Sequence, residues 1–346
     1  MAIAADTLAA DYRALTERCG ILDRSERGKL ALTGPEAKDF LQGQVTNDVE
    51  GLEPGQGCYA AFLTHKGKML GDLRILDTGE ELLLDTERVS LQELFNMIRR
   101  YKLARAVELH KRTLELGLLS LIGPDARRVA GVDPGPAEHA GVRAGELLVV
   151  ATDAGLDVFC PAAETDAVRA RFEAAGAVPV AEEAAEALRV EHGRPRYGAD
   201  LDDTVIPQEA GLNERAVSFT KGCYVGQETV ARLYYRGKPN RHLRGLRLSA
   251  PAQTGRPLLR GDKEVGRVGT VALSPVHGPI ALAIVRREAA PGETLVVGGG
   301  DEMVGRDEMV GRDEIVAGGV EIAGRDEIVA GGGVVTAEVV ELPFRE

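Results

Sequence analysis

The sequence predicts an α+β protein whose C-terminal part consists of β-strands. Between residues 102 and about 178, strand and helix patterns occur together without a dinucleotide-binding fingerprint, which indicates segregated sheets and helices. After Asn240 the pattern changes to short apolar runs separated by Gly and Pro, as in a small β-barrel or sandwich. Pro239 lies where this change occurs and suits a linker, so we expect two units, 1–240 and 241–346.

The N-terminal hundred residues contain the clearest periodic patterns. Apolar residues recur at helical spacing from Thr7 and again from Val89. The turn residues at 65–68 separate two apolar runs and predict a hairpin. We expect helices over 7–18, 34–41 and 89–101, and strands over 29–33, 59–64, 69–76 and 82–85.

The remaining elements are predicted from shorter apolar runs and amphipathic segments. In the middle of the chain we expect strands over 114–122, 147–152 and 155–160, and helices over 163–175 and 181–191. In the C-terminal unit we expect strands over 243–248, 265–273, 280–286 and 294–297.

Short charged repeats occupy about residues 298 to 333. The unit Asp-Glu-Met-Val-Gly-Arg occurs at 301–306 and 307–312, and Asp-Glu-Ile-Val-Ala-Gly-Gly occurs at 313–319 and 326–332. These units are shorter than the ~20 residues of a solenoid repeat. We therefore expect a flexible insertion in the last hairpin of the C-terminal unit.

Length and charge limit the class of protein. The chain has 346 residues, of which 44% are apolar, and a net charge of −12, which fits a globular protein of about two or three domains. The acidic balance argues against nucleic acid or an anionic membrane as partner. No apolar run reaches the ~18 residues of a membrane span, no signal peptide is evident, and four scattered cysteines indicate reduced thiols in a cytoplasmic protein.

Several motifs that would define a known chemistry are absent from the sequence. The six histidines include no helical zinc-binding pair, and no Cys-x-x-Cys occurs, so we expect no metal site. The sequence also lacks the phosphate-binding loop of nucleotide hydrolases and the nucleophile elbow of hydrolases.

One segment concentrates reactive groups. Cys223 follows Lys221 by two residues, lies between glycines and shortly precedes a predicted helix that begins near Glu228. The positive end of a helix dipole and a nearby ammonium both favour a reactive thiolate, so Cys223 and Lys221 are candidate catalytic residues. A buried structural cysteine in a tight turn explains the same spacing equally well.

The octapeptide at 221–228 resembles the signature of the YgfZ family of folate-binding and iron–sulfur cluster assembly proteins, within the glycine cleavage T-protein superfamily. Four further segments resemble family motifs: 40–49, 66–70, 206–210 and 342–344. The resemblance covers nearly the whole chain except about residues 298 to 333. It implies two intertwined α+β modules around a folate channel, with a C-terminal β-barrel.

The resemblance also implies folate-binding residues. Glu191 matches a T-protein glutamate that binds the pterin, whose adjacent N–H and amino groups suit one carboxylate. From the residues alone, an exposed helix-end glutamate is the favoured interpretation of Glu191, and a turn is the ordinary role of Asn47 and Asp48. The other expected contacts of tetrahydrofolate, or of a one-carbon derivative, are Asp72, Tyr224, Gln227 and Arg232.

Two departures from the T-protein pattern bear on function. Gly71 stands where the T-protein has a second acid beside Asp72, and Gln227 stands where arginine is common. We therefore expect a tetrahydrofolate-dependent accessory protein that supports assembly or repair of client iron–sulfur enzymes through Cys223. The alternatives are a folate-dependent aminomethyltransferase and a folate-binding module without turnover.

Overall fold

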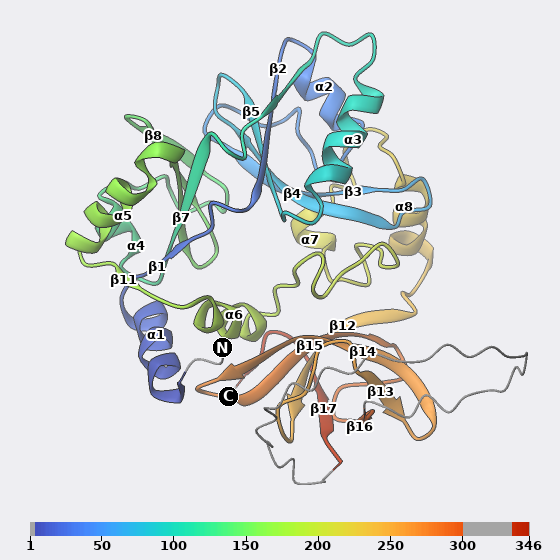
Figure 1. Cartoon of the computed structure of the whole chain (residues 1–346). Helices are drawn as coiled ribbons and strands as arrows, with labels where there is room; N and C mark the ends of the chain where they lie inside the picture. The colour runs from blue at the N-terminus through green and yellow to red at the C-terminus, as the bar shows by residue number, and fades with distance from the viewer. Residues whose placement is uncertain (1–3, 300–333, 346) are drawn as a thin grey trace, which may run out of the picture.

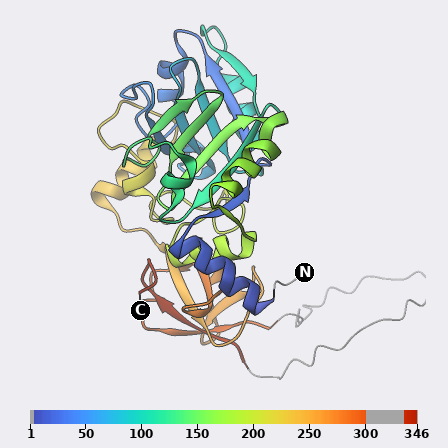
Figure 2. The ribbon, with the colours of Figure 1, turned by 90° about the vertical axis from the view of Figure 1, so that its left-hand side faces the viewer.

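The structure is a computed structural model that describes residues 4–299 and 334–345. Two α+β modules lie side by side, and a closed six-stranded barrel lies below them (Figures 1 and 2). The predicted α+β class and the C-terminal barrel are thus confirmed. Most of the expected repeat insertion, residues 300–333, lies outside the described residues. Within the described part of the chain, no helix is long and apolar enough to cross a bilayer.

Each part of the molecule is built on one sheet. The first module has the strand order β3 (Gly57–Leu63), β4 (Met69–Asp77), β5 (Leu82–Thr86), β2 (Gly28–Thr33) and β6 (Glu108–Lys111). The second has the order β11 (Val178–Pro179), β1 (Gly20–Asp23), β7 (Leu116–Ile122), β10 (Gly155–Pro161), β9 (Leu147–Ala151) and β8 (Gly141–Ala144). The barrel order is β12 (Arg241–Leu248), β15 (Gly278–Arg286), β14 (Lys263–Ser274), β13 (Pro257–Arg260), β16 (Thr294–Val297) and β17 (Thr336–Val340).

The helices cover these sheets and join them. They are α1 (Ala5–Glu17), α2 (Ala37–Gln42), α3 (Leu91–Tyr101), α4 (Ala126–Ala130), α5 (Thr165–Ala174), α6 (Glu182–Glu191), α7 (Asn213–Ala216) and α8 (Gln227–Arg236), with the short 3-10 helix η1 (Ala162–Glu164) before α5. In α3, Leu94 and Ile98 are fully buried in the core of the first module, as its apolar face predicts.

The two modules are intertwined along the chain. Strand β1 joins the second sheet, whereas β2, only a few residues later, joins the first. The strands that the sequence patterns missed are short: β1, β6, β8, β11, β13 and β17. Such segments have too few residues to display a period of two, so tertiary pairing decides their structure.

Helix α6 connects the modules to the barrel. Arg189 of α6 donates hydrogen bonds to Asp200 (2.7 Å) and to the hydroxyl of Thr270 in β14 (2.7 Å). The N–H of Phe344, after the last barrel strand, donates to the carbonyl of Glu191 (2.8 Å). These hydrogen bonds anchor α6 to the barrel.

A chain of buried ion pairs links the two sheets. The fully buried carboxylate of Asp85 in β5 accepts from Arg27 (2.9 Å) and Arg74 (2.7 Å), and Arg74 also binds Asp157 in β10 (2.5 Å). Burial acts to raise the pKa of Asp85, but the two guanidiniums hold it well below its usual range. The ionised carboxylate is therefore part of the folded state.

Replacing this carboxylate tests the link. We expect Asp85→Asn to lower the free energy of unfolding at pH 7 by about 3 kcal/mol, because both buried guanidiniums lose a partner. Since the folded pKa of Asp85 lies below the unfolded value of about 3.9, its stabilisation is present above about pH 4 and is lost as the pH falls further. Urea unfolding at pH 7, 4 and 3 should show the deficit shrinking in acid.

The exposed pair of Glu264 with Arg267 supplies the control, because Glu264→Gln should leave stability unchanged within error. A deficit of Asp85→Asn that stayed constant down to pH 3 would contradict an ionised, paired Asp85.

Candidate functional site

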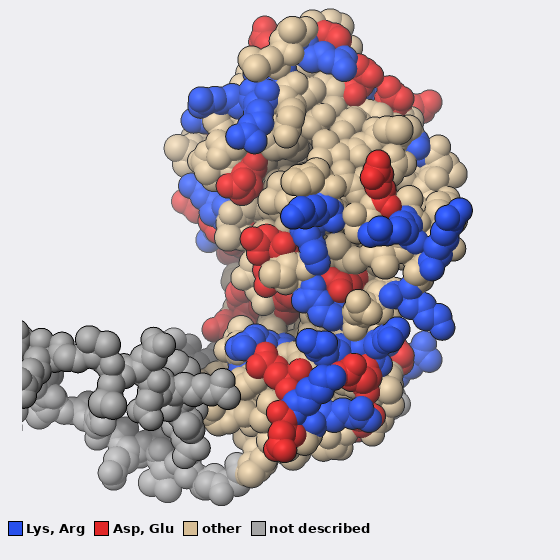
Figure 3. All heavy atoms as spheres, turned by 90° about the vertical axis from the view of Figure 1, so that its right-hand side faces the viewer, with Lys and Arg blue, Asp and Glu red and all other residues tan. Residues whose placement is uncertain are grey.

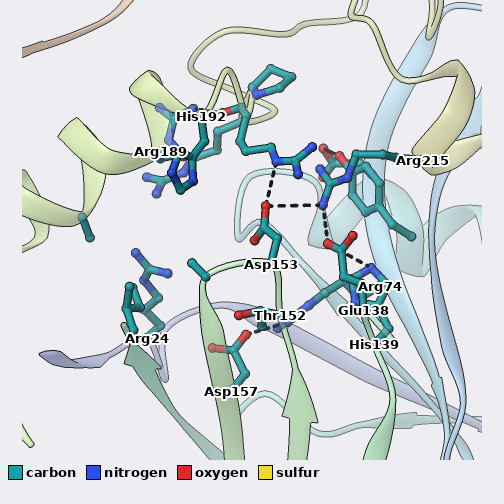
Figure 4. A pocket seen from close by; sticks show the side chains of 18 of the residues that line it. Arg24, Arg74, Glu138, His139, Thr152, Asp153, Asp157, Arg189, His192 and Arg215 are labelled. Atoms are coloured by element: carbon teal, nitrogen blue, oxygen red, sulfur yellow. Dashed lines mark hydrogen bonds and ion pairs between the residues drawn. The ribbon is translucent and has the colours of Figure 1, made fainter. Parts of the chain in front are cut away.

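A cavity of about 230 Å³ lies between the two modules and α6 (Figure 4). Its wall is strongly charged, and each of its arginines also bonds a carboxylate. An anionic ligand group would therefore compete with protein carboxylates for these guanidiniums. The charged and imidazole side chains of the wall are Arg24, Arg27, Arg74, Arg189, Arg194, Arg196, Arg215, Asp72, Glu87, Glu138, Asp153, Asp157, His139 and His192.

Asp72 and Tyr59 form the polar centre of the first module's side of the cavity. The Tyr59 hydroxyl donates to Oδ2 of Asp72 (2.7 Å), and the guanidinium of Arg215 lies over the Tyr59 ring at 5.4 Å. Burial raises the pKa of Asp72 to about 6, although the hydrogen bond from Tyr59 opposes this shift. Asp72, which the sequence predicts as a folate contact, thus lines the cavity and titrates near neutral pH.

Asn47 positions this pair without lining the cavity. Its Nδ2 donates to the carbonyls of Tyr59 (2.9 Å) and Arg215 (3.2 Å), which fixes the backbone of two cavity residues. Asp48 accepts from the side chain of Gln42 at the end of α2 (2.9 Å). Asn47 and Asp48 therefore stabilise the turn in which they lie, which is the ordinary role of both residue types.

Glu191, at the end of α6, is not among the residues that line the cavity. Its carboxylate accepts from the hydroxyls of Tyr12 (2.6 Å) and Ser274 (2.5 Å), between α1 and the barrel. The neighbouring His192 lines the cavity, and one helical residue is a rotation of about 100°. The prediction that Glu191 contacts the pterin is thus not supported by the geometry, because its oxygens are engaged elsewhere.

Lys221 ties the cysteine motif to the first module. Its ammonium donates to the carbonyls of Gln42 (2.6 Å), Val45 (2.8 Å) and Asn47 (2.8 Å). Burial lowers the pKa of Lys221 to about 8, so the ammonium form still dominates at pH 7. All three hydrogens of the ammonium group have acceptors. Lys221 is therefore a tether between the cysteine loop and the first module, and not a free cation beside the thiol. Cys223 is exposed in the loop before α8, which excludes the interpretation as a buried structural cysteine.

Glycine is required where this loop meets the β3–β4 hairpin. Gly226 precedes α8 with a φ of +86°, and a Cβ at this position would lie 2.6 Å from the carbonyl of Thr64. Any other residue would combine backbone strain with a steric clash. The glycine of the motif thus fixes how α8 packs on the hairpin.

The other motif residues predicted to bind folate lie outside the described cavity. Tyr224 is buried in a core cluster with Val217 and Val230, and Tyr59 packs against the same cluster. Gln227 and Arg232 belong to α8, where Arg232 is exposed. Figure 3 shows Lys and Arg side chains gathered on this side of the molecule. Binding of folate by Tyr224, Gln227 and Arg232 stays a prediction that the cavity does not support.

The described residues do not suggest a metal centre. Across 4–299 and 334–345, no group of three or more His, Cys, Asp or Glu side chains is arranged to hold an ion. Of the four thiols, Cys19 and Cys160 are buried, Cys58 is half-buried and Cys223 is exposed. The exposed thiol is therefore the one that a partner protein can reach.

Known proteins match both parts of this architecture. Residues 2–132 match the GCVT N-terminal domain, and residues 241–305 match the CAF17 C-terminal beta-barrel domain. The chain is 31% identical to the aminomethyltransferase of Rubrobacter xylanophilus, over 83% of this chain and 82% of that protein. It is 29% identical to a putative chloroplastic transferase of Arabidopsis thaliana, over 80% and 68%. The crystal structure of glycine cleavage system aminomethyltransferase T from Bartonella henselae has the same fold, with a TM-score of 0.80, 19% identity and coverage of 97% and 89%.

The chain belongs to the YgfZ/CAF17 family of the glycine cleavage T-protein superfamily. In this YgfZ/CAF17 chain the second acid of the T-protein pattern cannot simply be restored. A Cβ on Gly71 would lie 2.6 Å from ring atoms of Phe62 and from Cβ of Ser90. The space next to Asp72 at position 71 is thus filled by packing, so a second acid there would displace Phe62 or Ser90.

Most of the cavity wall was missed by sequence reasoning. The arginines come from separate segments, and the sequence does not show which carboxylate each will meet. One sequence pattern could have indicated part of the wall. Four residues that line the cavity follow the spacing of one helix face: Ala185, Leu188, Arg189 and His192. The sequence did not indicate a site role for His139, because a single histidine in a turn has many ordinary roles.

Removing the tether tests how the segment at 221–228 is held. We expect Lys221→Met to raise amide exchange at residues 42–47 and 218–226 by about tenfold or more, because charge-assisted hydrogen bonds to three carbonyls are lost. The barrel should exchange as before. Hydrogen–deuterium exchange by mass spectrometry measures both regions.

The exposed Lys66 in the β3–β4 hairpin supplies the matched control, since Lys66→Met should leave exchange in both segments unchanged. Equal protection in Lys221→Met and the wild type would show that the tether does not hold the loop.

Proposed function

We propose that the protein is a tetrahydrofolate-dependent accessory factor that supports assembly or repair of iron–sulfur enzymes, with Cys223 as the reactive group presented to client proteins. One observation carries this proposal: the exposed thiol loop and the cavity share a single hydrogen-bonded turn. Lys221 binds the carbonyl of Asn47, and the Asn47 side chain binds the backbone of Tyr59 and Arg215 in the cavity wall.

The residues of the cavity fit a reduced folate. The pterin presents N–H and amino donors, for which the Asp72 carboxylate is a suitable buried acceptor. The folate tail carries carboxylates, for which the arginines of the wall are suitable. When bound, the cofactor would supply a one-carbon unit. The cavity volume, about 230 Å³, is slightly below the ~300 Å³ of the smallest drug-like sites, so the cavity would enclose only part of the folate.

The thiol and the cavity have separate roles in this proposal. Asp72, Tyr59 and the arginines of the wall bind and orient the folate. Cys223 lies at the surface and is accessible to another protein. Family membership supports the folate part, and the placement of the exposed thiol supports the client part.

Aminomethyl transfer is the second candidate function. It is favoured by Asp72, whose pKa near 6 allows it to exchange a proton at neutral pH. It is disfavoured by Gly71, since packing against Phe62 leaves no room for the paired acid of the T-protein pattern. Turnover of an aminomethyl-lipoyl substrate in a steady-state assay separates the two functions.

Folate binding is tested at Asp72. We expect Asp72→Asn to weaken tetrahydrofolate binding by about ten- to a hundredfold, because a charge-assisted acceptor is lost. Since the Asp72 carboxylate is protonated below its pKa of about 6, wild-type affinity should fall as the pH drops from 7 to 5. The Asp72→Asn variant should show no such fall. Anaerobic titration calorimetry at both pH values measures the affinities.

Glu191→Gln is the control, because the Glu191 carboxylate binds Tyr12 and Ser274 outside the cavity. If Glu191→Gln weakened binding while Asp72→Asn did not, the pterin would have to lie beside α1 and the barrel instead.

The role of the thiol is tested in cells that lack their own YgfZ-type protein. The wild-type chain should restore iron–sulfur enzyme activity, and Cys223→Ser should lose most of this rescue, because a hydroxyl is far less nucleophilic than a thiol at neutral pH. Purified Cys223→Ser should keep its melting temperature and folate affinity. Activities of iron–sulfur enzymes in lysates provide the readout.

Cys58→Ser is the matched control. Burial raises the pKa of the half-buried Cys58 to about 12, so this thiol is unreactive and its replacement should leave rescue intact. Full rescue by Cys223→Ser, together with failure of Asp72→Asn, would favour the transferase function.

A further inference from the structure

His139 is a cavity residue held in an unusual position. It lines the cavity, yet only 7% of it is exposed. Its φ is +68°, in the left-handed region that residues other than Gly adopt infrequently. Its N–H donates to the carbonyl of Ala151 at the end of β9 (2.8 Å), and the N–H of Ala151 donates to the carbonyl of Ala140 (2.8 Å). The sheet therefore fixes the turn, and the turn fixes the place of the ring.

The two ring nitrogens of His139 differ in their surroundings. Nε2 lies 3.6 Å from Oε1 of Glu138, an oxygen that also accepts from Arg215 (Figure 4). Nδ1 is buried and has no hydrogen-bond partner within the described part of the chain. A buried polar atom without a partner is destabilising, and since His139 belongs to the cavity wall, a donor from a ligand would remove this cost.

The ring is neutral at pH 7, and its neighbours select a tautomer. Burial, and after it Arg74, lowers the pKa of His139 to about 4, with Arg215 acting in the same direction and Glu138 and Asp153 opposing. A neutral imidazole has one donor and one acceptor nitrogen. The Glu138 carboxylate beside Nε2 favours the proton there, which leaves Nδ1 as a bare acceptor.

We propose that His139 makes the cavity selective for reduced folates by accepting, at Nδ1, a hydrogen bond from a ring N–H of the ligand. This inference rests on the proposed folate function. A tetrahydropterin ring carries N–H groups at N5 and N8, whereas the oxidised ring of folic acid has bare nitrogen acceptors at both positions. A site built to bind an N–H discriminates against an analogue that lacks it, because the buried acceptor is then left unpaired.

Asp72 does not supply this discrimination. The pterin amino and N–H donors that suit its carboxylate are present in oxidised and reduced folates alike. Asp72 thus contributes affinity for both forms. His139, from the second module, distinguishes between them by the hydrogens of the reduced ring.

Two substitutions at His139 separate the effect of the acceptor nitrogen from the effect of the backbone conformation. Glycine and asparagine both tolerate a positive φ, so both variants should fold. Asparagine keeps an acceptor oxygen close to the position of Nδ1, whereas glycine removes the side chain. Anaerobic titration calorimetry on the full chain gives the affinities of the wild type, His139→Asn and His139→Gly for tetrahydrofolate and folic acid.

We expect the wild type to bind tetrahydrofolate more tightly than folic acid. In His139→Gly the ratio of the two affinities should fall about tenfold, because tetrahydrofolate binds more weakly. His139→Asn should retain most of the wild-type ratio. Equal weakening of both ligands, an unchanged ratio in His139→Gly, or a wild type without preference would overturn the inference. A wild type that binds neither folate would remove the proposed folate function itself. Tight tetrahydrofolate binding with an unchanged ratio would remove only the role of His139.

Discussion

The buried carboxylate of Asp85 is the group on which the arrangement of the cavity depends. Transfer of a charge into the interior is costly unless opposite charges surround it, so Asp85 requires both Arg27 and Arg74. These arginines also line the cavity, and Arg74 continues to Asp157 in the second sheet. The ion pairs that offset the burial of Asp85 therefore also hold two cavity walls at a fixed separation.

The turn around Asn47 connects this rigid cavity to the surface thiol. Asn47 binds the backbone of Tyr59 and Arg215 on one side and the Lys221 ammonium on the other. Three carbonyl acceptors orient the ammonium, so the Cys223 loop has a defined place although its thiol is exposed. In the segment at 221–228, Lys221 and Gly226 thus have structural roles, whereas Cys223 is accessible at the surface.

The sequence predicted the fold class and the longer elements because their periodic patterns are local. The hairpin of β3 and β4 and the apolar face of α3 are examples. It did not show the partners of Glu191, since a resemblance identifies a position in the chain but not the direction in which a helical side chain points; Tyr12 and Ser274, distant in sequence, donate to its carboxylate. It missed His139 because the burial and the unpartnered nitrogen of that residue arise only from tertiary packing.

The replacement of a paired acid by Gly71 has a physical consequence for the chemistry of the cavity. With Phe62 packed where a side chain at position 71 would stand, the hydrogen-bond partner of the Asp72 carboxylate is the hydroxyl of Tyr59. Two adjacent carboxylates would stabilise a developing cation, whereas one carboxyl group with a pKa near 6 stabilises it less. Under the proposed folate function, the cavity is therefore better suited to holding a folate than to transforming it. The proposal then requires a reactive group elsewhere, and Cys223, whose thiol is exposed, is its candidate.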